Sequence, residues 1–76
     1  MDEIKDSLIH ILQELIGDEI FIGDDIGFFD MGISSLTIAT FCERIKEMFN
    51  VSCDETDIFN YSNIQELSEF IKSSMQ

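Results

Sequence analysis

The stretch Asp30-Met31-Gly32-Ile33-Ser34-Ser35-Leu36 stands directly before a strongly amphipathic segment. Glycine permits a tight turn, and serine favours the first positions of a helix. We therefore expect a helix from Ser35 to Phe49. Six residues of this segment fall on one face at helical spacing and should face the core: Ile38, Phe41, Cys42, Ile45, Met48 and Phe49. One serine would then lie exposed at a helix N-terminus, open to covalent modification.

A second stripe of the same helix lies on a different side from the core face. It consists of Leu36, Thr40, Glu43 and Glu47, at i, i+4, i+7 and i+11. A single exposed leucine is ordinary on a protein surface. Because Leu36 lies next to the serine and heads an otherwise polar and acidic stripe, we interpret it as a contact for a partner protein.

The rest of the chain predicts an all-α fold with three main helices, a short fourth helix and a long loop after the first. The first helix is expected from Asp2, as N-cap, to Ile16, with Gly17 ending it. A short helical turn is expected at residues 56–60, with Ile58 and Phe59 facing the core. The last helix is expected from about Ile64 to Ser73. Asn63 followed by Glu66 forms a capping-box pattern before it, and Ile64, Leu67 and Ile71 make its apolar face.

The long loop, residues 17–34, has no helical period and no partner for a strand. Loops of this length usually have a function or pack as a unit. Its apolar residues argue for packing, and we expect Phe29 above all to fill the space between the helices. For Met31 and Ile33 two interpretations stay open, namely loop packing and an exposed rim around the serine.

Length and composition restrict the function. The 76 residues form a single domain, residues 1–76, and carry a net charge of −12. Such a surface should repel nucleic acid and anionic membranes and suits partners with basic patches, although acidic charge can also serve solubility alone. No apolar run reaches membrane-helix length. Cys42 and Cys53 lack the spacing of a metal site, and two cysteines are a weak case for a disulfide scaffold. We therefore expect reduced thiols in a cytoplasmic protein, and we expect a monomer.

Other chemistries of the serine are poorly supported. A hydrolase elbow requires GxSxG after a strand, and residues 32–36 lack the second glycine. The single histidine, His10, lies off the core face of the first helix, where a solvated residue is the simpler interpretation. No phosphate-binding glycine loop and no EF-hand spacing occurs, so no metal site is expected.

A family resemblance covers residues 4–71. The segment from Phe28 to Leu36 resembles the pattern F-F-D-L-G-x-D-S-L of acyl and peptidyl carrier proteins, and residues 58–67 resemble their L-F-x-x-P-T-I-x-x-L. Two departures from the family pattern matter. Ser34 replaces the usual Asp, and Ser62-Asn63 replaces Pro-Thr. Since Leu36 follows Ser35, the motif aligns on Ser35 as the modified residue, with Ser34 as helix N-cap.

The resemblance implies a protein that is not an enzyme. A phosphopantetheinyl transferase, using coenzyme A and magnesium, would attach 4′-phosphopantetheine to Ser35. The thiol of this arm would carry acyl or aminoacyl groups as thioesters between a loading enzyme and downstream synthase or tailoring enzymes. Partner contacts are expected at Asp30, Met31, Ile33, Ser34, Leu36, Thr40, Glu43 and Glu47. The motif favours polyketide or nonribosomal peptide biosynthesis over fatty-acid synthesis. The alternatives are a small acidic helical interaction module without a prosthetic group and, more remotely, a serine hydrolase dependent on His10.

Overall fold

The computed structural model describes residues 3–17 and 21–75 and contains four helices and no strand within them. These are α1 (Glu3–Ile16), α2 (Ser35–Phe49), α3 (Glu55–Asn60) and α4 (Ile64–Met75). The all-α prediction is confirmed, and α2 has the predicted bounds. Asp2, the expected N-cap of α1, lies outside the described residues.

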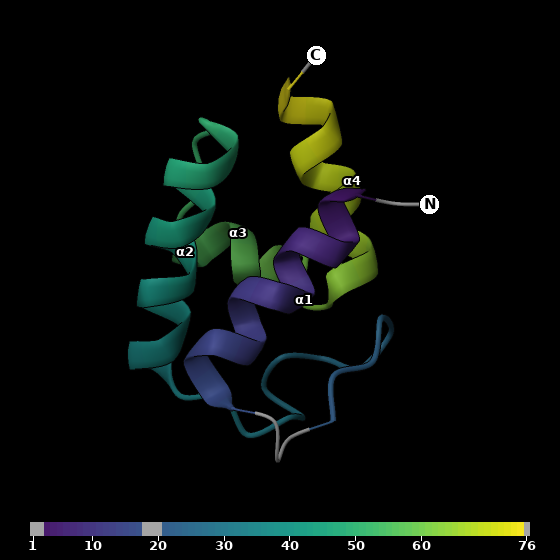
Figure 1. Ribbon diagram of the computed structural model, residues 1–76, viewed down its shortest axis with the longest axis vertical. Coiled ribbons are helices and arrows are strands. Elements are labelled where there is room, and N and C mark those ends of the chain that lie inside the picture. Colours follow the sequence, from purple (N-terminus) through teal and green to yellow (C-terminus); the bar gives the residue numbers. More distant parts are fainter. Residues whose placement is uncertain (1–2, 18–20, 76) are drawn as a thin grey trace.

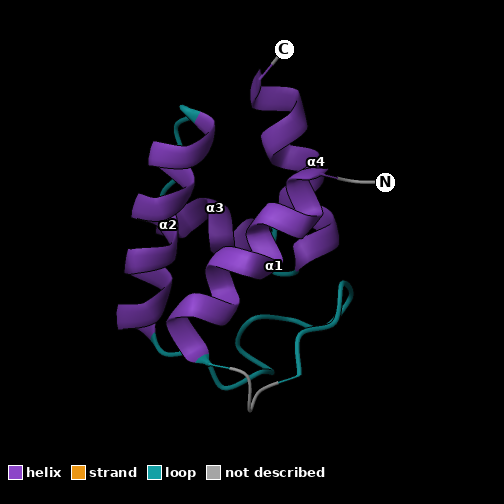
Figure 2. Ribbon diagram, viewed as in Figure 1, coloured by secondary structure: helices purple, strands orange, loops and turns teal. Residues whose placement is uncertain are grey.

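The helices form a small bundle around one core. The first helix, α1, packs against both α2 and α4, and α3 packs against α2. In Figure 1, α1 runs between α2 and α4, and the long loop lies at the end of the molecule where α2 begins. Figure 2 shows that the regular structure of the described residues is helical and that a long loop connects α1 to α2. The N-terminal end of α2 is therefore bordered by loop backbone.

The predicted apolar faces supply most of the core. Leu8, Ile11 and Leu12 of α1 are buried, as are Ile64, Leu67 and Ile71 of α4. On α2 the predicted core residues Ile38, Phe41, Cys42 and Ile45 are buried and Phe49 is half-buried. Each buried Leu or Ile contributes roughly 1.5–3 kcal/mol through removal of its side chain from water.

Three apolar residues do not lie where the pattern placed them. Phe29 was expected to fill the core, but its neighbour Phe28 is fully buried and Phe29 is 42% exposed. The ring of Phe28 meets that of Phe41 edge-on, with centroids 5.6 Å apart. Phe59, expected to face the core, is 58% exposed because the short helix α3 buries only Ile58. Met48, one residue before the end of α2, is 51% exposed.

Backbone hydrogen bonds attach the loop to the start of α4. The Phe28 N–H donates to the Ser62 carbonyl oxygen at 2.8 Å, and the Gln65 N–H donates to that of Asp24 at 3.0 Å. Asn63 caps α4 as predicted, because its Oδ1 accepts the Glu66 N–H at 2.8 Å. These bonds hold the part of the loop from Asp24 to Phe28 against the start of α4.

An ion pair joins α1 to α2 on the surface. Arg44 donates to a carboxylate oxygen of Glu14, and His10 lies 3.2 Å from the other oxygen. The hydrogen bond from Arg44 holds the pKa of Glu14 below its usual value. His10 is exposed, which agrees with its interpretation as a solvated helix residue.

Candidate functional site

The candidate site is the N-terminal end of α2, where Ser35 is the first helical residue and is exposed. The first N–H groups of a helix have no partner within the helix and create a partial positive charge. The first turn of α2 contains no acidic residue that would oppose an anion there. This end of α2 therefore suits a side chain that carries a phosphodiester.

The two adjacent serines have different surroundings. Ser34 has extended backbone angles, φ −78° and ψ 161°, and its Oγ accepts the Thr37 N–H at 3.3 Å. The hydroxyl groups of Ser34 and Thr37 also lie 3.1 Å apart. Ser34 is therefore the N-cap of α2, as predicted. Its hydroxyl contacts the first turn of the helix, whereas Ser35, the next residue, is exposed.

A compact turn brings the chain into this position. The N–H groups of Asp30 and Met31 donate to the Gly27 carbonyl oxygen at 3.0 and 3.1 Å. The turn ends at Gly32, whose φ of +80° is a left-handed conformation that non-glycine residues rarely adopt. A Cβ atom at Gly32 would meet nothing within 4 Å. The glycine is therefore required for its backbone angle, because a Cβ atom at this position would meet no other atoms nearby.

The residues expected around the serine divide into exposed and buried groups. Leu36 is 79% exposed, and Thr40, Glu43 and Glu47 are exposed below it on the same stripe. Asp30 is exposed and Met31 is half-buried against the core. Ile33 is only 6% exposed and belongs to the core. For Ile33 the structure therefore supports loop packing, and we withdraw it from the exposed rim.

Sequence reasoning missed an aromatic pair beside this region. The rings of Phe29 and Phe59 stack with centroids 5.0 Å apart and planes 6° from parallel. Both are partly exposed, so the pair forms an apolar surface that joins the loop to α3. Two consecutive phenylalanines in a loop without periodicity carry no signal that tells which ring turns inward.

The two cysteines lie away from this chemistry. Both are buried free thiols, as expected. Burial raises the pKa of Cys53 to about 12 and also raises that of Cys42, so both remain protonated near neutral pH. Within residues 3–17 and 21–75, no three residues of metal-binding type form a group that could hold an ion. None of the helices described has the length and apolar character needed to cross a membrane.

Comparisons with known proteins agree with this geometry. The profile of the family described as "Phosphopantetheine attachment site" matches residues 6–71. The chain is also similar to a segment of "Polyketide synthase PksN" from Bacillus subtilis (strain 168), with 38% identity over 71 residues. That alignment covers 93% of this chain and 1% of the relative. The chain therefore spans about one hundredth of the length of this relative.

Proposed function

Because this chain belongs to the phosphopantetheine attachment family of carrier domains, whose prosthetic group is 4′-phosphopantetheine, we propose that Ser35 is the residue that carries this group. Domains of this family are carriers and not catalysts. When bound, the group supplies a thiol at the end of a flexible arm, on which acyl or aminoacyl cargo is held as a thioester. The single observation that carries the proposal is an exposed serine at the first position of α2.

The chain's own residues prepare Ser35 for this modification. The turn ending at Gly32 delivers the chain to α2, and Ser34 caps the helix so that its first turn is ordered. The exposed hydroxyl can then enter the active site of a phosphopantetheinyl transferase. There, with magnesium present, the Ser35 oxygen would bond to the phosphorus that carries the pantetheine arm of coenzyme A. The pyrophosphate bond of coenzyme A would break, adenosine 3′,5′-bisphosphate would leave, and the serine proton would pass to a base. The positive end of α2 favours the phosphodiester that results.

The stripe below Ser35 is the proposed docking face. Leu36 offers an apolar contact, and Glu43 and Glu47 offer negative charge to basic residues of the transferase and of synthase enzymes. Lys46 lies 3.8 Å from Glu43 and partly offsets its charge. Asp30, Met31, Ser34 and Thr40 complete this face. Such contacts should be weak and short-lived, because a carrier must leave each enzyme in turn.

We place the domain in polyketide or nonribosomal peptide biosynthesis, as a monomeric carrier. The similarity to a segment of a polyketide synthase supports the first of these. The arm would let one cargo visit several active sites while it stays at high local concentration. The two free thiols are consistent with the reducing conditions of the cytoplasm, which we propose as the location.

The test is the intact mass of the protein after incubation with coenzyme A, magnesium and a promiscuous phosphopantetheinyl transferase. We expect a gain of one phosphopantetheine in the wild type and in Ser34→Ala, and no gain in Ser35→Ala. Absence of any gain with several transferases would favour an interaction module without a prosthetic group. A gain that persists in Ser35→Ala would place the attachment elsewhere.

A further inference from the structure

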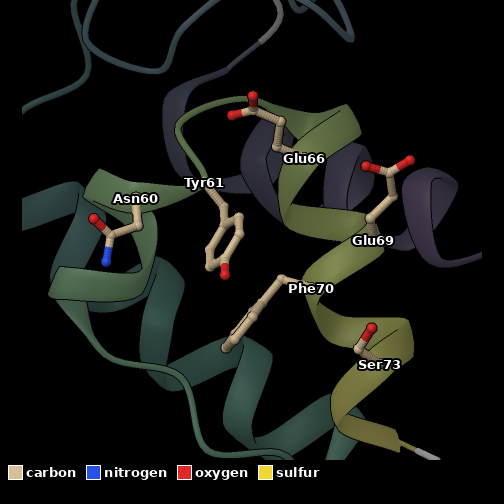
Figure 3. Close-up of a pocket in the computed structure, with 6 residues that line it drawn as sticks. All are labelled: Asn60, Tyr61, Glu66, Glu69, Phe70 and Ser73. Atoms are coloured by element: carbon tan, nitrogen blue, oxygen red, sulfur yellow. The ribbon is translucent and has the colours of Figure 1, made fainter.

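A pocket of about 410 Å³ lies between the end of α3 and the exposed side of α4. Figure 3 shows the residues that line it, which are Asn60, Tyr61, Glu66, Glu69, Phe70 and Ser73. None of them comes from α2 or from the loop before it. The pocket therefore belongs to a different part of the surface from Ser35 and its docking stripe.

Two aromatic rings form one side of this pocket. Tyr61 and Phe70 stack with centroids 4.7 Å apart and planes 19° from parallel. Tyr61 is 36% exposed and Phe70 is half-buried, so part of this stack is open to solvent. Aromatic faces attract cations, and a planar guanidinium group can lie flat against them.

Two carboxylates extend from α4 at the rim of the pocket. Glu66 and Glu69 are both exposed and are three residues apart, so they are neighbours on the helix surface. The Gln65 amide donates to Glu69 Oε1 at 3.2 Å, which restricts the position of that carboxylate. In Figure 3 both carboxylates lie toward one end of the pocket, and Ser73 lies toward the other.

The charges around the pocket favour a cation. None of the six lining residues is basic. Lys72 of α4 is not among them, and the whole chain contains four Lys and Arg residues against 16 Asp and Glu. Two carboxylates are too few to hold a metal ion by themselves, and no group of three potential ligands occurs among the described residues.

We propose that this pocket binds an arginine side chain of a partner protein, at a docking point separate from Ser35. Arginine fits better than lysine, because its planar fork of five N–H donors can contact two carboxylates while its face stacks on an aromatic ring. A protein is the proposed source, because the strongly acidic surface attracts basic proteins over a wide area and an open surface pocket suits a projecting side chain.

The probe is the peptide acetyl-Gly-Arg-Gly-amide, titrated at low ionic strength into the ¹⁵N-labelled protein. We expect amide chemical-shift changes at the residues that line the pocket, with half-saturation on the order of 1–10 mM. The matching lysine peptide should bind about threefold or more weakly, since it lacks the planar fork. Ser35→Ala should bind the arginine peptide as the wild type does, because the proposal is independent of the modification.

Matched variants separate a specific pocket from general acidity. Glu66→Gln/Glu69→Gln and Glu43→Gln/Glu47→Gln each remove two charges, and only the first pair should weaken binding, by about tenfold. The single variant Glu69→Gln serves if the double variant is not folded. Equal weakening by both pairs, equal binding of both peptides, shifts spread over the acidic surface, or no shift at the pocket would each overturn the proposal.

Discussion

Replacing Phe28 by alanine should remove much of the stability of this domain. Phe28 is fully buried and contacts Phe41 edge-on. A buried phenylalanine removes about 150–250 Å² from water, which at roughly 25 cal/mol per Å² corresponds to roughly 4–6 kcal/mol. Measured Phe→Ala changes in protein cores cost about 3–5 kcal/mol. A 76-residue domain has a total free energy of unfolding of roughly 4–11 kcal/mol, so this one change takes a large share.

Phe29→Ala is the matched control. This ring is 42% exposed and stacks on Phe59 at the surface, so its removal opens no closed cavity. We expect a loss of roughly 2–3 kcal/mol, since the area argument applies only to the buried part of this residue. Phe28→Leu, which keeps most of the buried volume, should cost about 1 kcal/mol and remain measurable if Phe28→Ala does not fold.

The assay is urea unfolding followed by circular dichroism at 222 nm. The midpoint should fall in the order wild type, Phe29→Ala, Phe28→Ala, with little change in the slope m. If Phe29→Ala lost as much stability as Phe28→Ala or more, the assignment of Phe28 as the core residue of the loop would be refuted.

Three further predictions concern the approach to the site and the buried thiols. Gly32→Ala should lower the free energy of unfolding by about 1–2 kcal/mol, because alanine is strained at a φ of +80°; Gly32→Asn should cost less in the same urea assay, because asparagine tolerates this region better. Ser34→Ala should cost about 0.5–2 kcal/mol through loss of the N-cap, yet still accept phosphopantetheine, as unfolding and mass measurements on one sample would check. At pH 8 the folded apo protein should show no thiol that reacts rapidly with Ellman's reagent, because a pKa of about 12 leaves Cys53 about one part in ten thousand thiolate. Burial also raises the pKa of Cys42 and protects it in the same way. Rapid reaction of one equivalent of thiol is therefore expected only after the arm is attached, and rapid reaction of the apo protein would contradict this account.

Periodicity was enough to predict the helices. The apolar spacing and the serine pair identified α2 with its observed bounds, and Asn63 identified the start of α4. These signals are local, because a cap and a helical face are set by residues a few positions apart. The exposure of Leu36 followed from the same helical spacing, because Leu36 lies on a different side of the helix from the core face.

The errors lie where local pattern has no information. Phe28 and Phe29 are adjacent in a loop. The Phe28 N–H donates to the Ser62 carbonyl oxygen, a contact between residues far apart in the sequence that no local pattern predicts. Phe59 was assigned to the core because it is apolar, but α3 buries only Ile58. For Ile33, where both loop packing and an exposed rim stayed open, the structure shows packing into the core.

The most direct test of the central claim is to locate the attached group. The holo protein would be digested and the peptide that contains residues 34 and 35 fragmented in a mass spectrometer. We predict that the phosphopantetheine mass lies on Ser35, with Ser34 unmodified. Fragments that place it on Ser34, or on any residue outside the start of α2, would contradict the account.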